Sequence, residues 1–233
     1  MSLDERLARV RARIAAAESA AGRSPGSVRL LLATKTQDAA AIRAALLADA
    51  AASATSAGAG HRVLIGENRV QELVAKAPDL AGLASELHLI GPLQSNKVNA
   101  ALRWATCVQS VDSVALAERL DRRCAAEGRT LDVMVQVNVS GEPTKSGVAP
   151  AEAEDLADRV RALDRLRLRG LMTIGANSAD QGLVRQGFAR LRDLGDRIGT
   201  AELSMGMSRD LEAAVQEGAT IVRVGTAVFG ARG

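Results

Sequence analysis

The sequence predicts a (β/α)8 barrel from three observations: short apolar segments of strand character, helical periodicity between them, and a chain length that suits eight such units. The strand-like segments begin at Val28, Val63, Leu87, Cys107, Leu131, Leu166, Glu202 and Ile221. Strands that alternate with helices favour a parallel sheet with helical crossovers. We therefore expect a single α/β domain of the TIM type over residues 1–233, with an extra helix at its N-terminus.

The extra helix is predicted by Ser2 and Glu5, which have the S-x-x-E spacing of a capping box and precede apolar residues repeated on one helical face. Residues 39–50 predict the helix after the first strand. Residues 51–62 (AASATSAGAGHR) are small, polar and Gly-containing, so they predict a loop. A further apolar stripe at helical spacing predicts a long helix before the seventh strand and comprises Val184, Phe188, Leu191, Leu194 and Ile198.

An open, doubly wound sheet is the alternative architecture for such an alternating pattern. It would need a Gly-rich phosphate-binding turn after the first strand, and residues 33–38 (ATKTQD) do not form one. The barrel is therefore the favoured prediction.

The composition is that of a globular protein, with 47% hydrophobic and 24% charged residues. Its net charge of +3 is not concentrated in any Lys/Arg-rich run, and aromatic residues make up 1% of the chain. Nucleic-acid binding relies on basic patches and, for single strands, on stacking side chains. The sequence therefore argues against a nucleic-acid partner.

The cysteines and the N-terminus indicate a reduced cytoplasmic protein. Cys107 and Cys124 lack CxxC spacing, and with only His61 and His88 beside them a Cys/His metal cluster is not expected. The N-terminal segment MSLDERLARVRARI lacks the apolar core of a signal peptide. Because no apolar run approaches the roughly 18 residues of a membrane span, no membrane partner is expected either.

Lysine is rare in this chain. Of its 30 basic residues only Lys35, Lys76, Lys97 and Lys145 are Lys, and only a primary amine can form an imine. Lys35 directly follows the first strand, at the barrel face where TIM barrels carry their functional residues. The apolar residues before it predict a partly desolvated amine suited to act as a nucleophile, although an exposed lysine at a strand end is the alternative.

The ends of strands seven and eight predict a phosphate site, which many barrels form at this position. Ser208 precedes RDLEAAVQEG and is expected to be the N-cap of the next helix, with a hydroxyl that could bind phosphate. Gly225 would allow a close backbone approach, and Thr226 adds a second hydroxyl. A plain N-cap and a tight turn explain the same residues, so the spacing alone leaves both interpretations open.

Six motifs follow one another from the first strand to the C-terminus: ATKT, IGENRVQE, HLIGPLQSNK, NVSGEPTKSG, RGLMTIG and SMGMSRDLEAAVQEGATIVRVGTAVFGAR. Together they span nearly the whole chain and resemble the pyridoxal-phosphate homeostasis proteins (the YggS/PROSC family). The resemblance implies an alanine-racemase-like barrel of fold type III, usually monomeric, that binds pyridoxal 5'-phosphate (PLP).

The resemblance also implies which residues bind PLP. They are Lys35 for a Schiff base, Ser208, Gly225 and Thr226 for the phosphate, Arg223 for the pyridine nitrogen, and Asn68 and Met207 for the ring. A core methionine and a turn-capping asparagine would explain the last two almost as well. Two features depart from the family: Thr34 stands where Ser is often found, and residues 50–60 look longer than the usual short turn.

The sequence favours a carrier of PLP over an enzyme that uses it. A racemase of this fold needs a lysine and a tyrosine as bases on opposite faces of the substrate, and this chain has no Tyr. His88 lies within the third strand, where a hydrogen-bonded core histidine is expected, and His61 lies in the loop before the second strand. Arg223 cannot accept a proton from the pyridine nitrogen, which would limit carbanion stabilisation.

The expected function is therefore to hold PLP and to buffer or deliver it, with free PLP as a partner and apo-enzymes as further candidates. A racemase or decarboxylase, and a barrel that binds a sugar phosphate without an imine, are the alternatives. Lys97 and Lys145 lie in matched motifs, and we hypothesise that they form an electropositive rim at the functional face.

Overall fold

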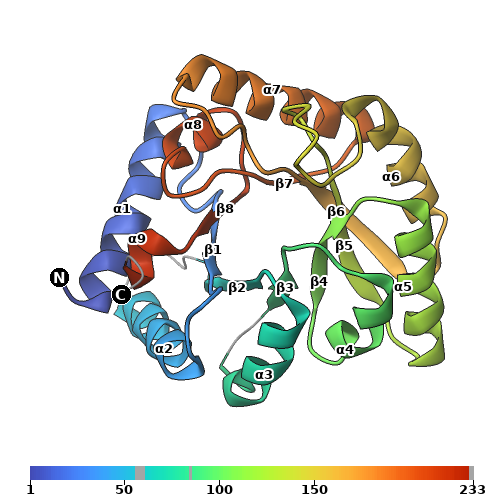
Figure 1. The fold of residues 1–233 in the computed structure, drawn as a ribbon. Helices are drawn as coiled ribbons and strands as arrows, with labels where there is room; N and C mark the ends of the chain where they lie inside the picture. Colours follow the sequence, from blue (N-terminus) through green and yellow to red (C-terminus); the bar gives the residue numbers. More distant parts are fainter. Residues whose placement is uncertain (56–60, 84–85, 231–233) are drawn as a thin grey trace.

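The computed structural model describes residues 1–55, 61–83 and 86–230, and this part of the chain forms a closed barrel of eight parallel strands (Figure 1). The strands follow one another around the barrel in sequence order, and β1 closes it by pairing with β8. The strands are β1 Arg29–Ala33, β2 Leu64–Glu67, β3 Leu87–Leu89, β4 Cys107–Val111, β5 Leu131–Gln136, β6 Leu166–Met172, β7 Glu202–Ser204 and β8 Ile221–Val224. The predicted (β/α)8 fold is confirmed.

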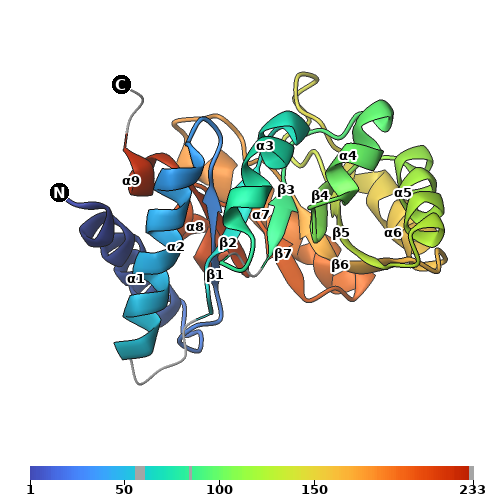
Figure 2. The ribbon, with the colours of Figure 1, turned by 90° about the horizontal axis from the view of Figure 1, so that it is seen from below.

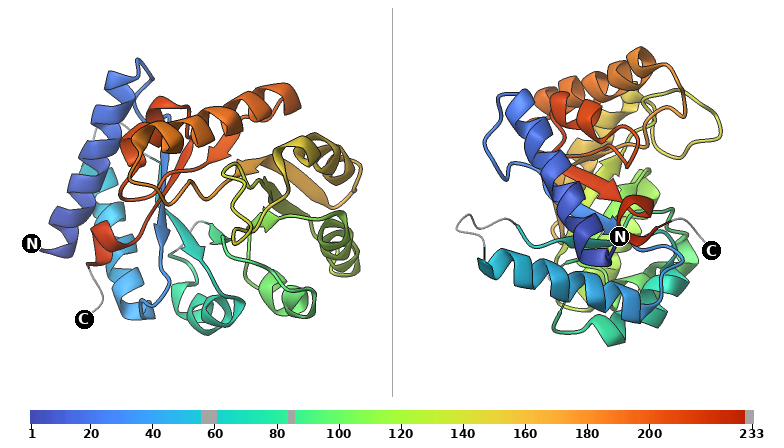
Figure 3. Two further views of the ribbon diagram at one scale, coloured as in Figure 1. Left: turned by 45° about the horizontal axis from the view of Figure 1, so that its top comes forward. Right: turned by 90° about the vertical axis from the view of Figure 1, so that its left-hand side faces the viewer.

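Helices surround the barrel and cover the outer face of its strands (Figures 1 and 2). They are α1 Leu3–Ala20, α2 Ala39–Thr55, α3 Val70–Leu80, α4 Val98–Leu102, α5 Val114–Ala126, α6 Ala153–Arg161, α7 Gln181–Ile198, α8 Leu211–Gln216 and α9 Thr226–Phe229, with short 3-10 helices at Ser95–Lys97 and Pro150–Glu152. The additional helix α1 packs against α2, α8 and α9, at the junction where the last strand meets the first (Figure 3).

The start of α1 has the capping box that the sequence predicts. The Ser2 hydroxyl accepts a hydrogen bond from the Glu5 N–H at 3.2 Å, and the Glu5 carboxylate accepts one from the Ser2 N–H at 2.8 Å. These bonds satisfy two of the N–H groups that a helix start leaves without partners. The apolar stripe expected in α7 is likewise buried, from Val184 through to Ile198.

The loop predicted over residues 51–62 is wrong for its first part, because α2 continues to Thr55. This stretch is rich in alanine, the residue with the highest helix propensity, and that propensity outweighs the serine and threonine content. Residues 56–60 lie outside the described part of the chain.

The interior of the barrel combines apolar and polar side chains. A small apolar cluster fills part of it and comprises Leu31, Leu64, Cys107, Met134, Met172 and Ile221. Buried polar residues on neighbouring strands occupy the rest, and they include His88, Gln109, Ser204 and Arg223. The barrel is thus a filled core rather than a pore, and its functional surface lies where the strands end.

Candidate functional site

A cavity of about 1160 Å³ opens at the carboxyl ends of the strands. Its walls come from the segments that follow β1, β2, β3, β5, β6, β7 and β8. All seven residues that the sequence analysis singles out for PLP line it: Lys35, Asn68, Met207, Ser208, Arg223, Gly225 and Thr226. The parallel topology brings them together because it places every strand's carboxyl end on the same face.

Lys35 lies in a tight turn that begins where β1 ends. Gln37 donates its N–H to the Thr34 carbonyl at 3.0 Å, and Thr36 takes a left-handed conformation with φ of 68°. Such a φ is unfavourable for a β-branched residue and is held here by a bond from the Thr36 N–H to the Glu72 carboxylate at 3.0 Å. The Lys35 side chain is exposed to the cavity rather than partly desolvated as expected, because the turn lifts it beyond the apolar strand.

A partly buried ionic cluster supports this turn. Lys76 on α3 donates to the Thr34 carbonyl at 3.0 Å and to the carboxylates of Glu67 and Glu72, each at 2.9 Å. The hydroxyl of Thr34 donates to the same Glu67 oxygen at 2.6 Å, so the hydroxyl at this position has a structural partner. Burial raises the pKa of Glu67, although its bonds to Thr34 and Lys76 act in the opposite direction.

Asn68 follows β2 and is placed by a close approach of two backbone segments. A Cβ on Gly91 would lie 2.1 Å from the Asn68 carbonyl oxygen and 2.6 Å from its side-chain oxygen. Only glycine therefore fits at position 91, where the backbone after β3 lies directly against Asn68.

Ser208 lies on the cavity wall but is not the N-cap of the next helix, as the sequence led us to expect. The helix α8 starts at Leu211 with Asp210 as its N-cap, and residues before it form a turn in which the Asp210 carboxylate accepts the Met207 N–H at 2.5 Å. The Asp210 side chain makes no capping bond to α8; its carboxylate instead stabilises the turn that carries Met207 and Ser208. Arg13 of α1 holds the same turn by donating to the Ser208 carbonyl at 3.0 Å.

Gly225 and Thr226 form the adjoining wall, where β8 ends and the short helix α9 begins. A Cβ on Gly225 would lie 2.9 Å from the Ala33 carbonyl oxygen of β1. The backbones of the first and last strands thus approach closely beside Lys35, which requires glycine at this position.

Arg223 points inward from β8 and is 5% exposed. Its guanidinium donates to the Ser204 hydroxyl at 2.8 Å and to the Thr173 carbonyl at 2.6 Å. Burial lowers its pKa to about 10, while nearby Asp210 acts to raise it. Arg223 therefore remains a cation at neutral pH and offers only hydrogen-bond donors to the cavity.

The loop after β6 contributes a large part of the cavity that sequence reasoning missed. Residues 174–179 line it; Ile174 and Gly175 end the RGLMTIG motif, and the only sequence signal of residues 176–179 was their position after a strand. Lys145 also lines it, held at 2.6 Å from the Glu142 carboxylate and at 2.8 Å from the Gly175 carbonyl. Lys97 does not line the cavity, so the rim hypothesised from both lysines is reduced to Lys145.

His88 is the core histidine that the sequence predicts, 2% exposed and hydrogen-bonded through both ring nitrogens.

Cys107 and Cys124 are buried as free thiols, and burial raises the pKa of each. Within the described ranges, no three His, Cys, Asp or Glu residues are grouped so as to hold a metal ion. None of the helices described is long and apolar enough to cross a membrane.

Comparison with known proteins agrees with this geometry. The family described as alanine racemase, N-terminal domain, matches residues 5–233. A relative from Pseudomonas aeruginosa named pyridoxal phosphate homeostasis protein is 46% identical over 233 residues, which cover 99% of this chain and 96% of that protein. The relative of the same name from Escherichia coli K12 is 42% identical, covering 97% and 95% of the two chains.

Solved structures show the same fold. PipY of Synechococcus elongatus, described with PLP bound, has a TM-score of 0.81 and 37% identity, covering 98% of this chain and all of that one. An alanine racemase from Clostridium difficile has a TM-score of 0.74 at 14% identity, covering 98% of this chain and 57% of that one. The barrel and its lysine-bearing cavity therefore define a protein of the alanine racemase N-terminal domain type. Within that class, the chain belongs to the family of pyridoxal phosphate homeostasis proteins.

Proposed function

We propose that this chain binds PLP as a Schiff base on Lys35 and holds it for buffering or delivery, without efficient turnover of its own. The observation that carries the proposal is the convergence of Lys35, Ser208, Arg223 and Thr226 on one cavity. The PipY relative, which is described with PLP bound, supports the choice of ligand.

The donor groups around the cavity match three of the polar parts of PLP: its phosphate, its aldehyde and its pyridine nitrogen. The hydroxyls of Ser208 and Thr226 are donors for a phosphate, and Gly225 allows it to approach the backbone. When bound, PLP would supply an aldehyde carbon to which the Lys35 nitrogen bonds with loss of one water. Arg223 lies deeper in the barrel, where a guanidinium would donate to the pyridine nitrogen.

The residues present argue against efficient amino-acid chemistry. Arg223 is a cation at neutral pH and cannot accept a proton from the pyridine nitrogen, so a PLP ring bound beside it would be a weaker electron sink than one protonated at that nitrogen. A second base opposite Lys35 would also be needed for racemisation, and the chain contains no tyrosine. His88 is buried with both nitrogens bonded, so it does not replace one.

The binding proposal is tested by titrating the purified protein with PLP and recording the visible spectrum. A Schiff-base absorbance that Lys35→Ala abolishes and Lys97→Ala retains supports it, because Lys97 does not line the cavity. A barrel that binds a sugar phosphate without an imine would show no such absorbance in the wild-type protein.

The carrier proposal is tested separately from binding. The holo-protein is incubated with single-enantiomer amino acids in deuterated water, and exchange of the α-proton is followed by NMR. Exchange no faster than with free PLP supports a carrier, whereas rapid exchange that depends on Lys35 would establish a racemase-like enzyme.

We further propose that the protein delivers PLP to apo-enzymes, that it is a monomer and that it lies in the cytoplasm. Lys145 is ion-paired at the cavity wall, where its charge can guide a phosphate in or out. Lys145→Gln should slow transfer of PLP to an apo-enzyme, and unchanged transfer rates would remove this role. Light scattering checks the monomer.

A further inference from the structure

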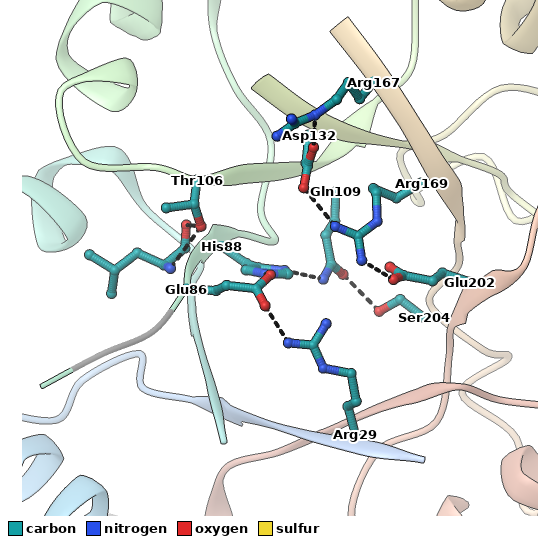
Figure 4. Close-up of polar contacts among 11 residues, drawn as sticks. Arg29, Glu86, His88, Thr106, Gln109, Asp132, Arg167, Arg169, Glu202 and Ser204 are labelled. Carbon is teal, nitrogen blue, oxygen red and sulfur yellow. Dashed lines mark hydrogen bonds and ion pairs between the residues drawn. The ribbon is translucent and has the colours of Figure 1, made fainter. Parts of the chain in front are cut away.

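A chain of buried polar side chains leads away from Arg223 through the middle of the barrel. The Ser204 hydroxyl, which accepts a bond from Arg223, donates to Gln109 Oε1 at 2.7 Å. Gln109 Nε2 lies 2.7 Å from His88 Nδ1, and His88 Nε2 lies 3.0 Å from the Glu86 carboxylate. Figure 4 shows Gln109 between His88 and Ser204, with Glu86 leading on to Arg29.

The three middle members of this chain of polar side chains are shielded from water. Ser204 and Gln109 are fully buried, and His88 is 2% exposed. They belong to β7, β4 and β3, so the chain crosses the barrel interior rather than following one strand. Inside a protein such bonds are strong and an unpaired member is costly, so the geometry of each member depends on the next.

The chemistry of these side chains fixes which group donates and which accepts in each hydrogen bond between them. An amide nitrogen only donates, so Gln109 Nε2 requires His88 Nδ1 to accept, which places the His88 proton on Nε2. That proton is donated to Glu86, whose pKa is lowered to about 2, first by the hydrogen bond with His88. At the other end the Ser204 proton is committed to Gln109, which leaves Ser204 only able to accept from Arg223.

We propose that Ser204, Gln109 and His88 are positioning residues that hold the Arg223 guanidinium in the orientation in which it meets the PLP ring. This inference rests on the proposed binding of PLP, since Arg223 matters to the ligand only if the ring lies beside it. The two Arg223 bonds to Ser204 and Thr173 fix the plane of the guanidinium, and the chain behind Ser204 fixes the Ser204 proton.

The test compares Gln109→Leu with Gln136→Leu as a matched control. Gln136 is also a barrel glutamine and is 2% exposed, but its side chain donates to the Ser146 carbonyl and to none of the polar side chains that lead to Arg223. Gln109→Leu should shift the absorbance maximum of bound PLP and weaken its binding about tenfold, the change expected for one misplaced charge-assisted hydrogen bond. The control should keep the wild-type absorbance maximum.

A second pair of variants covers the case in which Gln109→Leu does not fold. Ser204→Ala removes one of the two acceptors of Arg223 and should reproduce the spectral shift, while Ser204→Thr keeps a hydroxyl and should restore the wild-type spectrum. Wild-type spectra and affinities in both Gln109→Leu and Ser204→Ala would overturn the proposal.

Measurements without PLP separate this inference from the proposed function. Nitrogen NMR of a His61→Gln variant, in which His88 is the one histidine left, should show the proton on Nε2. The Arg223 guanidinium should rotate slowly in the wild-type protein and faster in Ser204→Ala. A proton on Nδ1, or equal rotation in both, would overturn the positioning role, whereas failure of the Lys35-dependent absorbance alone would count against PLP binding.

Discussion

Replacing Lys76 with methionine should weaken the fold in a way that depends on pH. The change removes three hydrogen bonds of 2.9–3.0 Å and leaves the Glu67 carboxylate, which is 1% exposed, with the Thr34 hydroxyl as its remaining partner. One Glu67 oxygen is already buried without a partner. Breaking a buried ion pair by removing one partner costs about 3–5 kcal/mol. We therefore expect the free energy of unfolding of Lys76→Met to be lower than that of the wild type by this amount at pH 8.

The pH dependence follows from the raised pKa of Glu67. Burial already raises this pKa, and loss of Lys76 removes two effects that oppose the rise. A carboxyl whose pKa is higher in the folded protein destabilises the fold when it ionises, so the deficit of Lys76→Met should grow between pH 5 and pH 8. Each further unit by which the loss of Lys76 raises the Glu67 pKa in the folded protein lowers the free energy of unfolding at pH 8 by about 1.4 kcal/mol.

Urea unfolding of the wild type, Lys76→Met, Glu67→Gln and the double variant at both pH values provides the assay. The double variant should recover much of the loss at pH 8, because it no longer buries an unpaired charge. Lys97→Met, a change outside this cluster, serves as the control. A deficit below about 1 kcal/mol, or one that is equal at both pH values, would refute the reasoning.

Two further predictions concern residues on either side of β3. Gly91→Ala should destabilise the fold by about 1–3 kcal/mol, because its Cβ would lie 2.1 Å from the Asn68 carbonyl; thermal unfolding measures this, and an unchanged midpoint would contradict it. Glu86, whose pKa falls from 4.5 to about 2 first through its bond with His88, should contribute stability above pH 4.5 and lose it as the pH falls towards 2. Because Glu86 is partly exposed, we expect about 1–2 kcal/mol, and acid unfolding of Glu86→Gln should lack this component.

The barrel was predictable because its evidence is local. Each strand is a short apolar run, each helix has its own periodicity, and both patterns can be recognised without knowing what packs against them. The same holds for Lys35 and Thr226, since a residue that follows a parallel strand must lie on the functional face. Where two local signals competed, the prediction failed: alanine propensity extended α2 through residues 51–55, and α8 begins after Asp210 rather than after Ser208.

The supports of the site could not be predicted because they depend on tertiary contacts. Glu72 and Lys76 are four residues apart and visible as a helical pair, but nothing local shows that Glu67 and the Lys35 turn lie against them. Ser204 and Gln109, which lie behind Arg223, are 95 positions apart in the chain, so they meet only when the register of the closed barrel is known.

The most direct test of the central claim is to trap PLP on the protein and find the residue that carries it. The holo-protein is reduced with borohydride, digested and mapped by mass spectrometry, which distinguishes the four lysines of the chain. We expect the phosphopyridoxyl group on the peptide that contains Lys35, with none in Lys35→Ala. Trapping mainly on Lys76, Lys97 or Lys145 in the wild-type protein, or no trapping at all, would contradict the proposal that Lys35 holds the cofactor.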